Sequence, residues 1–320
     1  MQKDDKVLAF GEITFEVRYG GAEANVALSL ALQGDRAAFF SIVPDNRIGD
    51  CALRSLSAYG VDTSRVLRQG DRLGTYYFEV GSSVRSNGCV YDRKYSALNL
   101  ASADDVDWDQ VLEGVGVFYV TAAVSDQMAV ACERALAACR ERGIVTVCDL
   151  NYRGKLWSPE KAQGVMRRLL PYVDVCIAND EDAPSCLGIC HGTGSLACGI
   201  DERDEYVEIA RDVCEEYGCK LVASVIRNVS SVEESDWMGM VYADGQAHFS
   251  SVHHMHVLEG VAAGDAYAAG LLHALLNGFD LDHASEYAIA ASVLKLTIHG
   301  DANFVTADEI EAVASKGAGL

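Results

Sequence analysis

The sequence is poor in positive charge. It holds 26 lysines and arginines against 47 aspartates and glutamates, so the 320-residue chain carries a formal net charge of −21. Such a surface repels polyanions, and we therefore expect neither nucleic acid nor an anionic membrane as a partner. An anionic substrate would need a local group of basic side chains.

Long apolar runs are missing as well. No stretch approaches the roughly 20 apolar residues that cross a bilayer, and the opening residues, MQKDDK, are too charged to begin a signal peptide. We therefore expect a cytoplasmic protein. Half of the residues are hydrophobic, which suffices for one large α/β domain over residues 1–320.

Paired cysteine motifs and a dinucleotide fingerprint are also absent. The 11 cysteines are odd in number and lie in apolar segments, as reduced core thiols do. The one cluster, within residues 186–198, lacks the C-x2-C spacing and the second half of a zinc site. A nicotinamide-dependent dehydrogenase would need G-x-G-x-x-G after the first predicted strand, where residues 11–14 read GEIT.

Strand-like and helix-like segments alternate along most of the chain, which predicts a doubly wound, mostly parallel sheet with helices on both faces. Ligands of such a sheet bind at the carboxyl ends of its strands. The predicted strands are residues 6–11, 37–43, 115–120, 144–150, 173–178 and 220–225, with a hairpin over 239–250. The predicted helices are residues 20–32, 48–59, 126–143, 159–172, 206–217, 268–277, 282–297 and 306–315.

The alternation breaks between residues 74 and 100. Two β-rich segments, 74–80 and 88–93, follow one another with a polar turn and no helix between them. We expect antiparallel strands that project from the main body and carry Tyr76, Tyr91 and Arg93. A solvated face stiffened by aromatic side chains is the alternative.

A small-residue turn leads into an apolar helix near residue 262. The side chains of Ala262, Ala263 and Gly264 are too small to shield their backbone N–H groups, which can face an anion at a helix start. Asp265 would repel phosphate, and it is better suited to take a proton from a hydroxyl nucleophile. The alternative is an ordinary glycine turn in which Asp265 only starts the helix.

Polar residues also follow three predicted strands, at 149–153, 179–182 and 224–227. Their convergence at one edge of the sheet predicts a binding site, although Asp and Asn are also common in turns and caps. Asn25 and its neighbour Glu23 are polar groups in an apolar stretch, which indicates hydrogen bonding to something polar.

With these motifs the chain resembles the ribokinase-like (PfkB) family of carbohydrate kinases over nearly its whole length. Residues 262–265 (AAGD) resemble the family's Gly-Ala-Gly-Asp motif, and residues 179–182 resemble its Asn-x-x-Glu motif with Asp in the last place. Further segments are similar to the subgroup that acts on 2-keto-3-deoxygluconate, namely residues 20–27, 90–97, 149–157 and 300–303.

The resemblance implies a kinase that uses ATP and Mg2+ to convert 2-keto-3-deoxygluconate to its 6-phosphate. A kinase for a neutral sugar such as fructose or ribose, or a silent sugar-binding regulator, is the alternative. The family resemblance implies that Asp265 is the catalytic base and that the amides of Ala262, Ala263 and Gly264 form the anion hole. It also implies that Asp182 holds Mg2+ indirectly. The implied substrate residues are Gly21, Asn25, Tyr76, Tyr91, Arg93, Asn151, Arg153 and Asp301. The implied nucleotide residues are Asn179, Ser224, Arg227 and Asn303.

The resemblance also implies a homo-oligomer, and it leaves open whether a monovalent cation is needed. Arg93 and Arg153 supply guanidinium groups that can hold the carboxylate of a sugar acid. The projecting strands would form a small β lid from residues 74–100 and about 12–20, which excludes water from ATP.

Two segments depart from the family pattern. Glu259-Gly260 stands where most members have an acid followed by Thr or Arg. The segment 12–20 is shorter than in most members, so either the lid is reduced or a stretch of chain is absent from this sequence.

Overall fold

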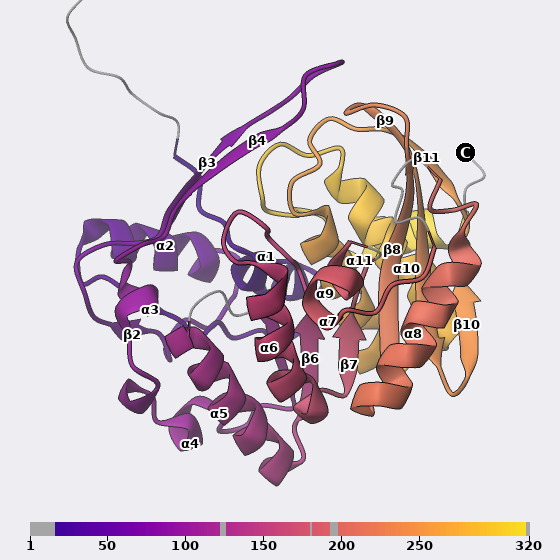
Figure 1. Cartoon of the computed structure of the whole chain (residues 1–320). Helices are drawn as coiled ribbons and strands as arrows, with labels where there is room; N and C mark the ends of the chain where they lie inside the picture. Colours follow the sequence, from indigo (N-terminus) through magenta and orange to yellow (C-terminus); the bar gives the residue numbers. More distant parts are fainter. Residues whose placement is uncertain (1–16, 122–125, 180, 193–197, 318–320) are drawn as a thin grey trace, which may run out of the picture.

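The protein is built around a seven-stranded sheet (Figure 1), whose strand order is β10-β9-β8-β7-β6-β5 with β11 also paired to β9. The computed structural model describes residues 17–121, 126–179, 181–192 and 198–317. The sheet strands are β5 (Val117–Thr121), β6 (Val145–Asp149), β7 (Val175–Ile177), β8 (Leu221–Val229), β9 (Glu234–Ala243), β10 (Gln246–Phe249) and β11 (His253–His256).

Strands β5 to β8 pair in parallel, and β9 pairs antiparallel with β8, β10 and β11. Parallel strands covered on both faces are apolar on both sides, and Val147 and Cys148 of β6 are both buried. Because successive side chains point to opposite faces, Val147 joins one apolar cluster and Cys148 the other. The predicted α/β sheet is confirmed.

Helices cover both faces of this sheet (Figure 1). One apolar cluster holds side chains of α5, α6, α7 and α8, and the opposite cluster holds side chains of α1, α9 and α10. The longer helices are α1 (Ala22–Leu32), α2 (Arg47–Ser57), α5 (Asp126–Arg142), α6 (Pro159–Leu169), α8 (Arg203–Tyr217), α9 (Ala263–Leu276), α10 (Leu281–Lys295) and α11 (Ala307–Ala314). The shorter ones are α3 (Ala97–Leu100), α4 (Trp108–Val111) and α7 (Asp182–Leu187), with 3-10 turns at Ala103–Asp105 and Leu170–Tyr172.

A two-stranded hairpin projects from the main body (Figure 1). It consists of β3 (Thr75–Glu79) and β4 (Gly88–Asp92), which pair antiparallel as predicted, with Tyr76 opposite Tyr91. At its tip, Ser82 Oγ donates a hydrogen bond of 2.6 Å to Glu233 Oε1 beside β9. The hairpin therefore reaches across toward the far end of the sheet.

Several predicted boundaries are wrong. The strand predicted at 37–43 is reduced to β1 (Ile42–Val43), which pairs in parallel with β2 (Leu67–Arg68) in a separate small sheet. The aromatic side chain of Phe40, within the predicted strand, packs against Trp108, with 5.6 Å between the two ring centroids. The predicted strand 6–11 and residues 12–16 of the lid lie outside the described residues, and 17–20 contain no strand.

Within the described ranges, no helix is long and apolar enough to cross a membrane.

Candidate active site

Helix α9 begins at the predicted small-residue turn, at Ala263 rather than the predicted residue 268. Ala262 precedes it in the left-handed conformation, with φ of 59°, and no described side chain caps the helix. The first backbone N–H groups of a helix lack intrahelical partners. Gly264 is exposed, and a Cβ atom placed there would meet nothing within 4 Å. The helix start therefore offers free amides and open space for an anion.

Asp265 lies in the first turn of α9 and is buried. Asn25 Nδ2 donates a hydrogen bond of 2.7 Å to its Oδ2 atom. Burial raises the pKa of Asp265 to about 6, against the opposing effects of the Asn25 hydrogen bond and Arg153, while Glu23 and Asp301 raise it further. The carboxylate makes no cap on its own helix, and at neutral pH it is ionised with a pKa suited to a general base.

Asn25 links Asp265 to the hairpin. The same amide nitrogen lies 3.4 Å from Asp301 Oδ2, and the Tyr76 hydroxyl of β3 donates to that oxygen as well. A chain of polar contacts thus runs from the hairpin through Asp301 and Asn25 to Asp265. Gly20 is needed beside this chain of contacts, because a Cβ atom at that position would clash with the side chain of Asp301. The predicted substrate residue is the neighbouring Gly21, whose φ is 140°, and Gly20 is not among the predicted residues.

Replacing Asn25 by Leu is expected to move the acid limb of the pH dependence of kcat/KM to higher pH. The Asn25 hydrogen bond lowers the pKa of Asp265, so its loss raises that pKa. A bond to a charged group is worth roughly 1.5–3 kcal/mol, which corresponds to a shift of about one pH unit or more. Asn277→Leu, at the exposed far end of α9, is the matched control. An acid limb that stays in place in Asn25→Leu would show that the hydrogen bond does not tune the base.

Asp149 ends strand β6 and is buried beside Asp265. Its Oδ1 atom accepts a hydrogen bond of 3.0 Å from the Asn151 backbone N–H, and the Tyr119 hydroxyl lies 3.4 Å from Oδ2. Burial raises the pKa of Asp149 well above its usual range, and the neighbouring carboxylates of Asp182 and Asp265 raise it further. Asn151 turns the chain with φ of 38°, a conformation that Asn tolerates better than most residues.

Asp182 links the segments that follow β6 and β7, and Asn179 links them to β8. Its Oδ1 atom accepts 2.7 Å from the Tyr152 N–H after β6, and its Oδ2 atom accepts 3.1 Å from Asn179 Nδ2 after β7. Asn179 Oδ1 in turn accepts 3.0 Å from the Val225 N–H in β8. Each Asp182 oxygen therefore accepts one protein hydrogen bond, and the indirect Mg2+ role that the family resemblance implies for Asp182 stays a prediction.

Two arginines act on Tyr91 of the hairpin. The Arg93 guanidinium lies 5.0 Å from the Tyr91 ring centroid, and the Tyr76 ring lies 6.3 Å from it. Burial raises the pKa of Tyr91, whereas the nearby Arg153 and Arg93 guanidiniums lower it. Arg153 is exposed, and its Nη1 atom donates 2.9 Å to the Tyr152 carbonyl. Its positive charge also lowers the pKa of Asp265, so its charge is felt at both Tyr91 and the buried base.

The three remaining residues predicted for the nucleotide are Ser224, Arg227 and Asn303. Ser224 and Arg227 lie within β8, not after a strand as predicted, because the pairing with β9 continues to Val229, and Asn303 lies between α10 and α11. Ser224 is buried and donates to the Ala178 carbonyl, and the Arg227 guanidinium lies 5.3 Å from the Trp237 ring centroid. Asn303 is buried, with Nδ2 at 3.4 Å from the Ala291 carbonyl and Oδ1 without a partner among the described residues. Their contact with a nucleotide stays a prediction.

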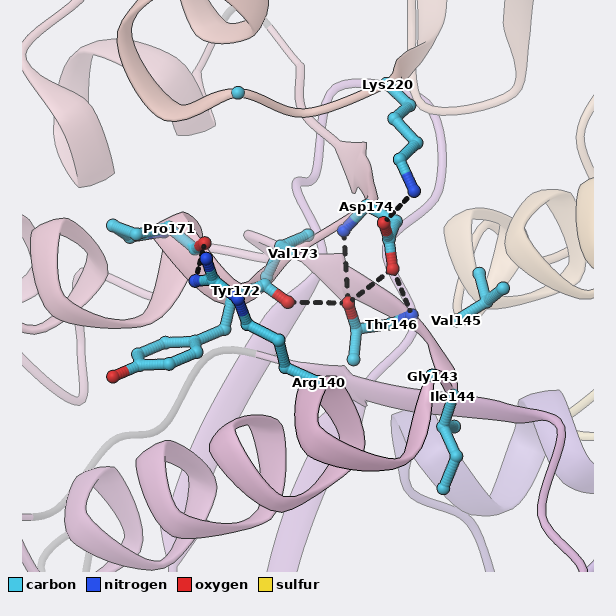
Figure 2. Close-up of a pocket in the computed structure, with 11 residues that line it drawn as sticks. Arg140, Gly143, Ile144, Val145, Thr146, Pro171, Tyr172, Val173, Asp174 and Lys220 are labelled. Carbon is cyan, nitrogen blue, oxygen red and sulfur yellow. Dashed lines mark hydrogen bonds and ion pairs between the residues drawn. The ribbon is translucent and has the colours of Figure 1, made fainter.

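A cavity of 360 Å³ lies at the opposite edge of the sheet, where β6, β7 and β8 begin (Figure 2). Asp174 there accepts hydrogen bonds of 3.0 Å from the Thr146 N–H, 3.1 Å from its hydroxyl and 2.7 Å from Lys220 Nζ. These contacts tie neighbouring strands together. The carboxyl ends of the strands, with Asp265, remain the candidate active site.

The fold and the site define a phosphotransferase of the ribokinase-like α/β class. Residues 3–308 match the pfkB family carbohydrate kinases, so the chain belongs to that family. Its reaction transfers a phosphoryl group to an alcohol group, and ATP is the donor that the family uses.

Individual relatives agree with this assignment. A 2-dehydro-3-deoxygalactonokinase from Haloferax volcanii is 30% identical over 95% of this chain and 90% of its own length. The crystal structure of a 2-dehydro-3-deoxygluconokinase from Thermotoga maritima is 40% identical, covers 98% of this chain and 94% of that chain, and superimposes with a TM-score of 0.89. A Xylella fastidiosa fructokinase with bound ATP shares the fold at 18% identity and a TM-score of 0.73, over 93% of this chain and 90% of that chain.

Proposed function

We propose that this protein transfers the γ-phosphoryl group of ATP to the 6-hydroxyl of 2-keto-3-deoxygluconate. The observation that carries the substrate class is the pair of guanidiniums, Arg93 and Arg153, near Tyr91 and across from the buried base Asp265. A guanidinium pairs with a carboxylate through parallel hydrogen bonds, and two of them offset the repulsion from a chain of charge −21. The T. maritima relative, a 2-dehydro-3-deoxygluconokinase, supports the same choice.

The buried carboxylate performs the proton transfer in this proposal. Asp265 takes the proton of the sugar hydroxyl as that oxygen attacks the γ-phosphorus, and the oxygen displaces ADP. The amides of Ala262, Ala263 and Gly264 face the phosphoryl oxygens as negative charge builds up on them. Asp182 and Asn179 would hold Mg2+ through water, and the ion supplies positive charge to the phosphates of ATP.

The hairpin closes the site from the other side. Tyr76 and Asn25 hold Asp301 in place for a sugar hydroxyl, and Tyr91, whose ring lies 6.3 Å from that of Tyr76, contacts the sugar beside them in this proposal. The contact of Ser82 with Glu233 holds the hairpin tip over the sheet. Excluding water in this way favours transfer to the sugar over hydrolysis of ATP.

Gly264→Leu is expected to lower kcat by about 10²- to 10³-fold, the usual cost of a lost oxyanion donor. The position has open space around it, so a leucine side chain fits there without a clash and the protein still folds. The side chain nevertheless covers the amides that face the phosphate. Gly164→Leu in α6, which also has open space, is the matched control. Steady-state kinetics and melting temperatures should show similar stability changes in both variants and a loss of activity in Gly264→Leu alone. Equal activity in the two variants would contradict the anion hole.

A substrate panel tests the proposed function. Purified protein is assayed for ADP release with ATP, Mg2+ and, in turn, 2-keto-3-deoxygluconate, its 4-epimer 2-keto-3-deoxygalactonate, fructose and ribose. The H. volcanii relative makes the 4-epimer the second candidate. We expect the gluconate form to have the highest kcat/KM and both acids to exceed the neutral sugars. A higher kcat/KM with fructose or ribose would overturn the sugar-acid assignment, and no turnover with any sugar would favour a silent regulator.

A further inference from the structure

The end of α10 supports the turn that precedes α9. The Leu296 carbonyl accepts hydrogen bonds from the backbone N–H groups of Leu258, at 2.9 Å, and Glu259, at 3.3 Å. Ser292 Oγ donates 2.9 Å to the Ala263 carbonyl. The position of the anion-hole turn, residues 258–264, therefore depends on the last turn of α10.

Lys295 lies in that last turn and has no exposed surface. Across the described ranges, it is the one lysine or arginine that is buried. Its Nζ atom donates 3.0 Å to the Ile298 carbonyl, at the start of the loop that carries Asp301. The ammonium is thus attached to the second segment of chain beside the base.

Three carboxylates act on this ammonium. Burial lowers the pKa of Lys295, and Glu259, Asp301 and Asp265 oppose that effect. Glu259 is itself buried and lies 3.1 Å from His299 Nδ1. A buried charge without a counter-charge is costly. Glu259, Asp265 and Asp301 place negative charge close to the site at which anionic ATP would bind. A fixed positive charge within the protein would therefore reduce the electrostatic repulsion there.

We propose that Lys295 is a positioning residue for the phosphoryl transfer, acting as an internal cation between the anion-hole turn and the loop that carries Asp301. This role rests on the proposed function of the same site. Lys295 touches neither substrate, because it is covered on all sides. Its ammonium holds the loop that carries Asp301 through the Ile298 carbonyl, and the same helix end holds the anion-hole turn through the Leu296 carbonyl. The charge of the ammonium offsets those of Glu259, Asp265 and Asp301.

The test compares Lys295→Met, which keeps the volume and removes the charge, with Lys220→Met. Lys220 is exposed and pairs with Asp174 at the opposite edge of the sheet (Figure 2). We expect Lys295→Met to lower kcat about ten-fold or more, the effect of one lost charged hydrogen bond. Its acid limb should also move to higher pH, because loss of the positive charge raises the pKa of Asp265. Lys220→Met should match wild type in both.

Chemical rescue separates the charge from the fold. In Lys295→Ala, methylammonium chloride should restore part of kcat, and tetramethylammonium chloride at equal ionic strength should not, because that ion is too large for the cavity. A kcat within about three-fold of wild type and an unmoved acid limb in Lys295→Met would overturn the positioning role, since one charged hydrogen bond is worth more. Failure of both variants to fold would overturn it too, by showing a purely structural lysine.

The outcome is distinct from that of the substrate panel. If the wild-type protein prefers a neutral sugar, the proposed function fails. The kcat and the pH dependence of the Lys295 variants are then measured with that neutral sugar. If wild type prefers a sugar acid and Lys295→Met is unaffected, only the role of Lys295 fails.

Discussion

Asp265→Asn is expected to lower kcat by about 10²- to 10⁴-fold, the usual share of a general base. The substitution keeps the size of the side chain and removes its charge. The amides at the start of α9 remain in place, so the affinity for Mg-ATP should change little. Steady-state kinetics and isothermal titration with Mg-ATP give the two quantities.

The same variant should differ from wild type in its pH dependence. The pKa of Asp265 is raised from 3.8 to about 6 by burial, so in wild type kcat/KM should fall as the pH drops below about 6 and the base is protonated. A carboxyl whose pKa is higher in the folded protein stabilises the fold at low pH, and that contribution is lost as the pH rises through about 6. Removing the charge should therefore raise the free energy of unfolding at pH 8 by up to about 3 kcal/mol.

Asp280→Asn is the matched control for this variant. Asp280 caps α10, accepting 2.9 Å from the His283 N–H, and Asn caps a helix equally well. The control should be close to wild type in both activity and stability. A kcat for Asp265→Asn within about three-fold of wild type, below the usual contribution of a base, would contradict the catalytic role.

Arg93→Met and Arg153→Met should each raise KM for the sugar acid about ten-fold or more. A hydrogen bond to a charged group is worth roughly 1.5–3 kcal/mol, and each substitution removes a guanidinium while keeping an apolar stem of similar length. The KM for a neutral sugar should change little, because a neutral sugar has no carboxylate that could pair with the arginines. KM values for both kinds of sugar, measured at saturating Mg-ATP, check the expectation.

Arg140→Met is the control for the arginine variants. Its guanidinium stacks 5.6 Å from the Tyr172 ring centroid and lies at the opposite edge of the sheet (Figure 2). Its KM should match wild type for every sugar. Equal increases of KM for acid and neutral sugars in Arg93→Met and Arg153→Met would show that the arginines shape the lid without selecting a carboxylate.

The sheet and its long helices could be predicted because burial on both faces leaves strong apolar patterns in the sequence. The strand β11 could not, since its residues His253–His256 give no apolar alternation and its pairing with β9 is a tertiary contact. The sequence predicts the start of α9 five residues too late, because Ala262 and Gly264 are typical of a turn. The neighbouring residues in the sequence do not indicate that Asp265 is buried and that the helix begins at Ala263.

The edge that carries the site could also be predicted, since polar residues follow buried strands there. The contacts within it could not, because Asn25 and Asp265 are 240 residues apart and Tyr76 and Asp301 are 225 apart. Lys295 left one weak signal, a single lysine among the apolar residues 293–296 of a helix. Charge on an apolar helix face is often solvated, and only the packing of α10 shows that this one is buried.

Phosphorus-31 NMR of the reaction mixture tests the central claim most directly. Wild-type protein is incubated with ATP, Mg2+ and 2-keto-3-deoxygluconate, and the spectrum is followed as ATP is consumed. The proposed function predicts ADP and one new phosphomonoester resonance, split by the two protons of the C6 methylene group. With Asp265→Asn the same resonance should form about 10²-fold more slowly or slower still. Release of inorganic phosphate alone, a phosphomonoester at another carbon, or no reaction would contradict it.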